Sequence, residues 1–178
     1  CVKIQGLVTV GVHGMGNGLI PIVAYNYGAR KQDRIRQSFR WALLYSAVIY
    51  SVFFLVMELA PEAVLRLFDA SEEMLAIGVT ALRVMAVSFL LSHVCLTCSA
   101  AFQGLGMGVT SMLLTLSRQV ALPMIFLAVL SHTKNLSLVW MAFVAAEAAV
   151  LPFGLFFWKR ETGRLPGFAP EIRMEREI

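Results

Sequence analysis

The sequence predicts an all-α membrane protein with five transmembrane helices. Three observations support this prediction: the composition, the length of the apolar segments, and the charge of the connections between them. Of the 178 residues, 58% are hydrophobic and 15% are charged, and the mean hydropathy is +0.74. A soluble domain typically has about 25% charged residues. The surplus apolar surface therefore requires lipid as its solvent, and the chain has no polar half that would form a separate soluble domain.

Five apolar segments are long enough to cross a bilayer, because a spanning helix needs about 20 mostly apolar residues. They cover residues 4–27, 39–59, 75–103, 109–131 and 136–158. We therefore expect one transmembrane bundle over residues 1–160 and a basic tail over residues 161–178. The first segment lacks the charged start and the cleavage site of a signal peptide. Since the chain begins with Cys1, we expect the natural protein to be longer.

The connections alternate in charge. Residues 28–40 contain five cations and one acid, whereas residues 58–73 contain five acids and one cation. The segment after Trp158 again carries basic residues, namely Lys159, Arg160, Arg164, Arg173 and Arg176. The positive-inside rule places residues 30–40 and the tail in the cytoplasm, and the four helices between them keep both on one side. We expect a multi-pass protein of the plasma (inner) membrane, whose cations act as orientation signals beside anionic headgroups rather than as a ligand site.

The acidic connection has local structure of its own. Residues 61–68 read as a short interfacial helix that begins at a proline. Ser71 is a suitable cap for the helix that follows, with Glu72 and Glu73 in its first turn.

Polar residues recur every fourth position in the first apolar segment, at Gln5, Thr9, His13 and Asn17. This spacing places them on one helical face. In lipid such a face points into the protein or toward a water-filled cavity. Two interpretations stay open: the face lines a substrate cavity, or it makes hydrogen bonds to neighbouring helices.

Small residues and prolines predict close contacts and bends. Gly14 and Gly18 form a G-x-x-x-G pair, which permits the close approach of another helix. Pro21 removes a backbone donor in the first apolar segment and predicts a bend there. Pro123 predicts a second bend, in the fourth segment.

Three ionisable residues lie within the predicted spans: Arg83, Arg118 and Glu147. Charged groups at membrane depth are costly and usually face the interior of the bundle. Glu147 is either a proton carrier or one half of a structural ion pair with Arg118. The pair is favoured because two arginines need partners and the spans contain one acid.

The sequence contains no pattern typical of an enzyme or a cofactor site. Cys95 and Cys98 form a C-x-x-C motif within an apolar helical segment, but no second motif completes a zinc site. We interpret them as buried, unreactive thiols. An intramembrane enzyme would have to use these cysteines with His93 and Glu147, and nothing in the sequence brings the four together. We expect no metal, no cofactor and no nucleic-acid partner.

Residues 18–30 read G-L-I-P-I-V-A-Y-N-Y-G-A-R. They resemble the segment Q-P-I-V-G-Y-N-Y-G-A-K of the multidrug and toxic compound extrusion (MATE) transporters, with Ile20 in place of Gln and Ala24 in place of Gly. The resemblance marks a structural motif at the end of a helix, comprising Pro21, Tyr25, Asn26 and Gly28.

Two further segments resemble the same family, in the same order. Residues 102–106, F-Q-G-L-G, are similar to an F-Q-A-L-G turn of the family, and residues 116–119 with Pro123 are similar to its L-R-Q…P helix. The resemblance extends over nearly the whole chain.

The resemblance implies a twelve-helix transporter of two six-helix lobes, of which this chain supplies the last five helices. Members export cationic drugs or metabolites in exchange for H⁺ or Na⁺. The implied partners are the missing N-terminal lobe, the bilayer, a small organic cation, and H⁺ or Na⁺. Some Na⁺-coupled members carry an acid in the tenth helix, where this chain has Arg83, which suits the branch resembling the DNA-damage-inducible transporters. The alternative is a non-transporting scaffold, or a half-size subunit that needs a partner.

Overall fold

The computed structural model of the protein describes residues 2–68, 71–132 and 136–164, with side chains for 13–68, 71–72, 74–132 and 139–163. The described residues form α-helices and one π-helical turn, and no strand. In chain order the elements are α1 (Val2–Gly28), α2 (Gln32–Leu59), α3 (Pro61–Leu67), α4 (Glu72–Gly104), α5 (Gly108–Leu116), η1 (Ser117–Ala121), α6 (Leu122–Ser131) and α7 (Leu136–Arg164).

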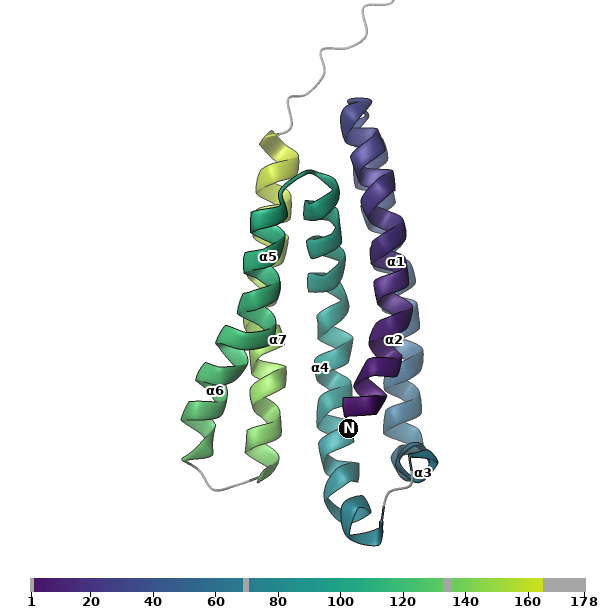
Figure 1. Ribbon diagram of the computed structural model, residues 1–178, viewed down its shortest axis with the longest axis vertical. Coiled ribbons are helices and arrows are strands. Elements are labelled where there is room, and N and C mark those ends of the chain that lie inside the picture. Colours follow the sequence, from purple (N-terminus) through teal and green to yellow (C-terminus); the bar gives the residue numbers. More distant parts are fainter. Residues whose placement is uncertain (1, 69–70, 133–135, 165–178) are drawn as a thin grey trace, which may run out of the picture.

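The long helices lie side by side and alternate in direction (Figure 1). Helix α4 is central and contacts α1, α2, α5 and α7. The α1–α2 turn, the α4–α5 turn and the end of α7 lie at one end of the bundle, and α3 lies at the other (Figure 1). Short connections between sequential neighbours make this an antiparallel bundle.

Four helices of the described residues are long and apolar enough to cross a membrane: Gln32–Leu59, Met74–Gly104, Gly108–Ser131 and Val139–Gly163. They correspond to the second to fifth predicted spans. Helix α1 has 27 residues, but its side chains are described only from His13 onward. The described part of the chain is therefore all-helical, with four candidate spans.

Two apolar clusters hold the bundle together. Near the α1–α2 turn, Phe39 of α2 stacks on Trp158 of α7 at 3.8 Å between ring centroids, and Phe102 of α4 packs against the same indole. Toward the opposite end, buried Tyr50 and Leu82 belong to a second cluster of α2, α3 and α4. Both clusters use α2 and α4, so these helices pack along most of their length.

The second predicted span begins seven residues too late. We expected residues 30–40 to be a loop because of their charge, but α2 starts at Gln32. The segment is helical because Ile35, Phe39 and Ala42 recur on one buried face. Gln32 Nε2 also donates a hydrogen bond of 2.9 Å to the carbonyl oxygen of Thr162 in α7.

The start of the next long helix follows the expectation. Short helix α3 begins at Pro61, and Ser71 caps α4, accepting a 3.4 Å hydrogen bond from the backbone N–H of Met74. The last helix is longer than its apolar segment, because α7 continues past Trp158 to Arg164.

The close helix contact lies at a different glycine from the one expected. A Cβ atom on Gly104 would lie 2.7 Å from Val23 Cβ and 2.8 Å from the carbonyl oxygen of Ile20, so α4 meets α1 there. Around Gly14 and Gly18, no other described atom lies within 4 Å of the position of a Cβ atom. No described helix therefore uses the G-x-x-x-G pair.

The backbone differs at the two prolines for which bends are predicted. Helix α1 continues through Pro21 to Gly28. In the fourth span, the π-helical turn η1 directly precedes α6, whose first turn contains buried Pro123. Because Pro123 has no N–H for the carbonyl one turn earlier, a wider turn accommodates the break in the hydrogen-bond ladder. Figure 1 shows α6 leaning away from the line of α5.

Candidate functional site

An ion pair lies inside the membrane-spanning part of the bundle. Arg118 Nη1 of η1 donates a 2.6 Å hydrogen bond to Glu147 Oε1 of α7. Each side chain is only 10% exposed. Two charges at this depth are stable only as partners, since each would otherwise lose its hydration without compensation.

Local sequence explains why the two charges meet. Helix α7 packs against α4, η1 and α6, and its Ala142 and Ala146 are buried. Arg118 is presented by the π turn, in which the chain turns more widely than in an α-helix. Turns of this kind recur at functional sites. The site thus combines an irregular backbone with a buried charge pair.

The pair leaves one acceptor free among the described residues. Glu147 Oε2 is buried and has no hydrogen-bond partner there.

Hydrogen bonds between small polar side chains also connect the helices, and the sequence reasoning missed them. Ser99 Oγ of α4 lies 2.6 Å from Ser111 Oγ and 3.1 Å from Thr115 Oγ1, both in α5. Ser46 Oγ of α2 lies 3.3 Å from Thr97 Oγ1 of α4. The available signal was the presence of Ser and Thr within apolar segments, where such residues hydrogen-bond across helices.

Arg83 is not buried, contrary to the expectation for a charge within a span. Its side chain is 52% exposed, and its Nε lies 3.9 Å from Oε1 of Glu58, which is 43% exposed. We had assigned Glu58 to the acidic connection, but it lies in the last turn of α2. Each of the two arginines therefore has its own acid, and they do not share Glu147.

The residues of the enzyme alternative do not form a catalytic set. Cys95 and Cys98 are buried free thiols, and His93 packs against Tyr50 with 6.0 Å between ring centroids. Glu147 Oε1 accepts a hydrogen bond from Arg118. Within the described residues, no group of three or more His, Cys, Asp or Glu side chains is placed to hold a metal ion.

The predicted polar face of α1 is open where it is described. His13 and Asn17 are both exposed. The side chains of Gln5 and Thr9 lie outside the described residues. At His13 and Asn17 the face is therefore not buried by the described residues.

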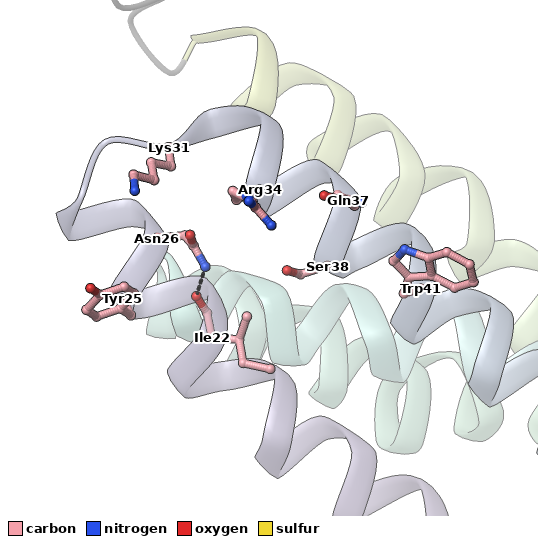
Figure 2. Close-up of a pocket in the computed structure, with 8 residues that line it drawn as sticks. All are labelled: Ile22, Tyr25, Asn26, Lys31, Arg34, Gln37, Ser38 and Trp41. Carbon is pink, nitrogen blue, oxygen red and sulfur yellow. Dashed lines mark hydrogen bonds between the residues drawn. The ribbon is translucent and has the colours of Figure 1, made fainter.

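The motif at the end of α1 borders a pocket of about 480 Å³, which we call the hairpin-end pocket (Figure 2). Asn26 Nδ2 donates a 2.8 Å hydrogen bond to the carbonyl oxygen of Ile22, while Tyr25 is 75% exposed. Gly28 is the last residue of α1, and Pro21 lies two turns before it. The pocket is lined by Ile22, Tyr25, Asn26, Lys31, Arg34, Gln37, Ser38 and Trp41.

Known proteins are similar to this chain in sequence and in the arrangement of their helices. The multidrug export protein MepA of Staphylococcus haemolyticus (strain JCSC1435) is 24% identical over 146 residues, which are 82% of this chain and 32% of MepA. The MATE multidrug transporter DinF-BH, solved in complex with R6G, is 28% identical with a TM-score of 0.80. That match covers 89% of this chain and 36% of DinF-BH.

An outward-facing multidrug resistance MATE family transporter of the MOP superfamily has the same fold, with a TM-score of 0.85 at 24% identity. The match covers 92% of this chain and 37% of that transporter. The chain thus spans about a third of the length of the relatives it matches. The model of the family described as MatE matches residues 1–130, most of the sequence. The chain therefore belongs to the MatE family of multidrug and toxic compound extrusion transporters.

Proposed function

We propose that this chain is the C-terminal part of a multidrug efflux antiporter, which moves small organic cations outward in exchange for H⁺ or Na⁺. The observation that carries this proposal is the match of nearly the whole chain to about a third of longer MATE transporters. In this proposal α1, α2, α4, α5–α6 and α7 are the last five of twelve transmembrane helices. The N-terminal lobe of the same polypeptide is the main partner.

The open face of α1 supports a cavity between two lobes. His13 and Asn17 are exposed, although exposed polar groups at membrane depth are costly in contact with lipid. A water-filled cavity shared with the N-terminal lobe removes that cost. We assign Gln5, Thr9, His13 and Asn17 to the wall of this cavity.

The Arg118–Glu147 pair has a structural role in this proposal. It ties the π turn to α7, so that the kinked span and its neighbour move together. A lobe that rocks as one body between two states needs such internal ties. Glu147 as the carrier of the coupling proton is the competing assignment, and the two differ in the variants described in the Discussion.

The membrane orientation follows from charge. We assign the protein to the lipid bilayer of the plasma (inner) membrane, with residues 30–40 and the C-terminal tail in the cytoplasm. The hydrogen bond between Gln32 and Thr162 supports this assignment, because it joins the basic start of α2 to the end of α7 at one end of the bundle. The acidic connection lies at the other end (Figure 1).

Transport by the full-length protein in proteoliposomes tests the proposal. We expect accumulation of a fluorescent lipophilic cation when an opposing H⁺ or Na⁺ gradient is imposed, and none without a gradient. A double variant that removes both side chains of the described cavity face, His13→Ala with Asn17→Ala, should reduce transport. Failure to transport under either gradient would favour the alternative, a membrane scaffold or a half-size subunit without transport of its own.

A further inference from the structure

The groove between α1 and α2 changes in character along its length. At the α1–α2 turn it contains the cationic hairpin-end pocket. Farther into the membrane-spanning part it becomes an apolar cavity of about 570 Å³, which we call the glycine groove. Ile22, Ser38 and Trp41 line both, so the two form one continuous depression. The glycine groove is lined by Gly14, Met15, Gly18, Leu19, Ile22, Ser38, Trp41, Ala42 and Tyr45.

Two cations of residues 30–40, which the sequence predicts to be orientation signals rather than a ligand site, line the hairpin-end pocket and are available to a ligand. The side chains of Lys31 and Arg34 are exposed and make neither a hydrogen bond nor an ion pair with the described residues. Figure 2 shows the guanidinium group of Arg34 pointing into the space between the two helices, with the hydroxyl group of Ser38 facing the same space. Arg36 differs, since its Nη2 donates a 3.2 Å hydrogen bond to the carbonyl oxygen of Thr162.

Glycine backbone forms part of the lining of the glycine groove. Gly14 and Gly18 contribute no side chain, and no other described atom lies within 4 Å of a Cβ position on either. Trp41 and Tyr45 form the opposite wall, with ring centroids 5.8 Å apart and about half of each side chain exposed. Aromatic side chains of this kind are enriched at the level of lipid headgroups.

We propose that this groove binds an anionic phospholipid, with the phosphate held by Lys31, Arg34 and Ser38 and an acyl chain along Gly14 and Gly18. The site rests on the proposed membrane orientation, which places it in the leaflet rich in anionic lipid. A cation attracts such a headgroup by about 1 kcal/mol, and Arg adds a fork of N–H donors that fits phosphate oxygens. A transmembrane helix as occupant would have to bring its own anion to this end of the groove.

Native mass spectrometry of the full-length transporter, stripped of lipid, tests the proposal. Phosphatidylglycerol and phosphatidylethanolamine with identical acyl chains are added in turn. We expect one phosphatidylglycerol molecule to be retained with a preference of about thirtyfold, because each of the two cations attracts the charged headgroup by about 1 kcal/mol. The double variant Lys31→Gln with Arg34→Gln should lose this preference. Arg40→Gln is the matched control, because Arg40 is an exposed cation of α2 that does not line the pocket.

Two outcomes would overturn the proposal. Equal retention of both lipids by the unaltered protein would show that the cations do not select a headgroup. Displacement of the lipid by soluble glycerophosphoglycerol at equal concentration would show a site for free phosphate esters rather than for a lipid.

A photoreactive side chain at Tyr45 gives a second readout that does not depend on the cations. We expect it to label phospholipid, because Tyr45 lines the glycine groove. Labelling of a peptide from the same polypeptide would mean that a helix fills the groove and would reject the lipid. Lipid retention is measured without a transport substrate. If the protein retains no lipid but its efflux is intact, the result contradicts the lipid site and leaves the proposed function standing. Retained lipid without efflux contradicts only the proposed function.

Discussion

At the Arg118–Glu147 pair, two opposite charges compensate for the hydration that each has lost. With 2.6 Å between Arg118 Nη1 and Glu147 Oε1 and side chains 10% exposed, removing either partner leaves an uncompensated buried charge. The Arg83–Glu58 contact is the natural comparison, because it is longer at 3.9 Å and largely exposed. Exposed pairs typically contribute about 0–1 kcal/mol, whereas breaking a buried pair costs about 3–5 kcal/mol.

Removing one partner of the buried pair should therefore destabilise the transporter. We expect Arg118→Ala to lower the stability of the full-length protein by about 3–5 kcal/mol, since Glu147 is left unpaired. The double variant Arg118→Ala with Glu147→Ala should recover part of the loss. Thermal unfolding of the detergent-solubilised protein measures both. Arg83→Ala serves as the control and should change the melting temperature little.

A substitution that keeps the shape of Glu147 separates the structural role from proton transfer. With Glu147→Gln, the structural role predicts pH-driven efflux that persists at a reduced protein level. Normal protein level with complete loss of pH-driven efflux would instead identify Glu147 as the proton carrier.

For the stability measurements, a double Ala variant no more stable than the Arg118→Ala variant would show that the pair contributes no coupling energy.

At the scale of helices, backbone contacts and irregular turns determine how α4 and the fourth span pack. Helix α4 reaches α1 where Gly104 lies against Val23 and the carbonyl oxygen of Ile20. The π turn before Pro123 redirects α6 and presents Arg118 to α7. Both features join elements that are distant in sequence into one unit.

The contact at Gly104 should tolerate no side chain. A Cβ atom there would lie 2.7 Å from Val23 Cβ, so we expect Gly104→Ala to force α4 and α1 apart and to cost about 1–3 kcal/mol. Gly108→Ala is the matched control, because no described atom lies within 4 Å of its Cβ position. Thermal unfolding of the two variants side by side measures the difference. Equal melting temperatures would show that the helices do not meet as closely as described here.

Sequence alone predicts the ends of a helix well where the length of its apolar segment determines them. Both ends of the predicted spans 75–103 and 109–131 lie within three residues of the ends of the observed helices. The prediction succeeds because a backbone in lipid must form its hydrogen bonds within a helix, so the length of the apolar segment sets the length of the helix. The sequence analysis did not predict the start of α2. The charged residues there lie on the exposed face of the helix, and the apolar residues of its buried face were not recognised. Charge density alone does not distinguish a loop from an amphipathic helix end.

The candidate site was less predictable, because it depends on contacts between distant residues. Arg118 and Glu147 are 29 residues apart, and their pairing was one of two open interpretations of the sequence. The partner of Arg83 was missed because Glu58 was assigned to a connection. The unused Gly14–Gly18 pair shows that a motif permits a contact without specifying a partner within the same chain.

At the scale of the whole molecule, the chain has surfaces that it does not cover itself. Many large apolar side chains are exposed on α2, α5 and α6, as expected where lipid or another part of the transporter packs. His13 and Asn17 are exposed on α1 as well, but they are polar. In the proposed transporter the apolar surface faces lipid or the other lobe, and the polar surface of α1 faces the central cavity.

Thiol labelling tests the surface assigned to the cavity. We expect Asn17→Cys in the full-length transporter to react with a membrane-impermeant maleimide from at least one side, because water fills the cavity. Ser46→Cys is the buried control, since Ser46 is only 1% exposed and hydrogen-bonds to Thr97. Protection of Asn17→Cys from both sides would place α1 in a dry helix interface.

The central claim is that this chain is one part of a longer transporter, and the mass of the native polypeptide tests it most directly. An antibody against the tail, residues 165–178, would detect the product in its source membrane. We predict a polypeptide more than twice the 19.6 kDa of this chain, since the chain covers 36% and 37% of the related transporters. A native product of 19.6 kDa would contradict the account and would favour a half-size subunit that needs a partner to enclose a pathway.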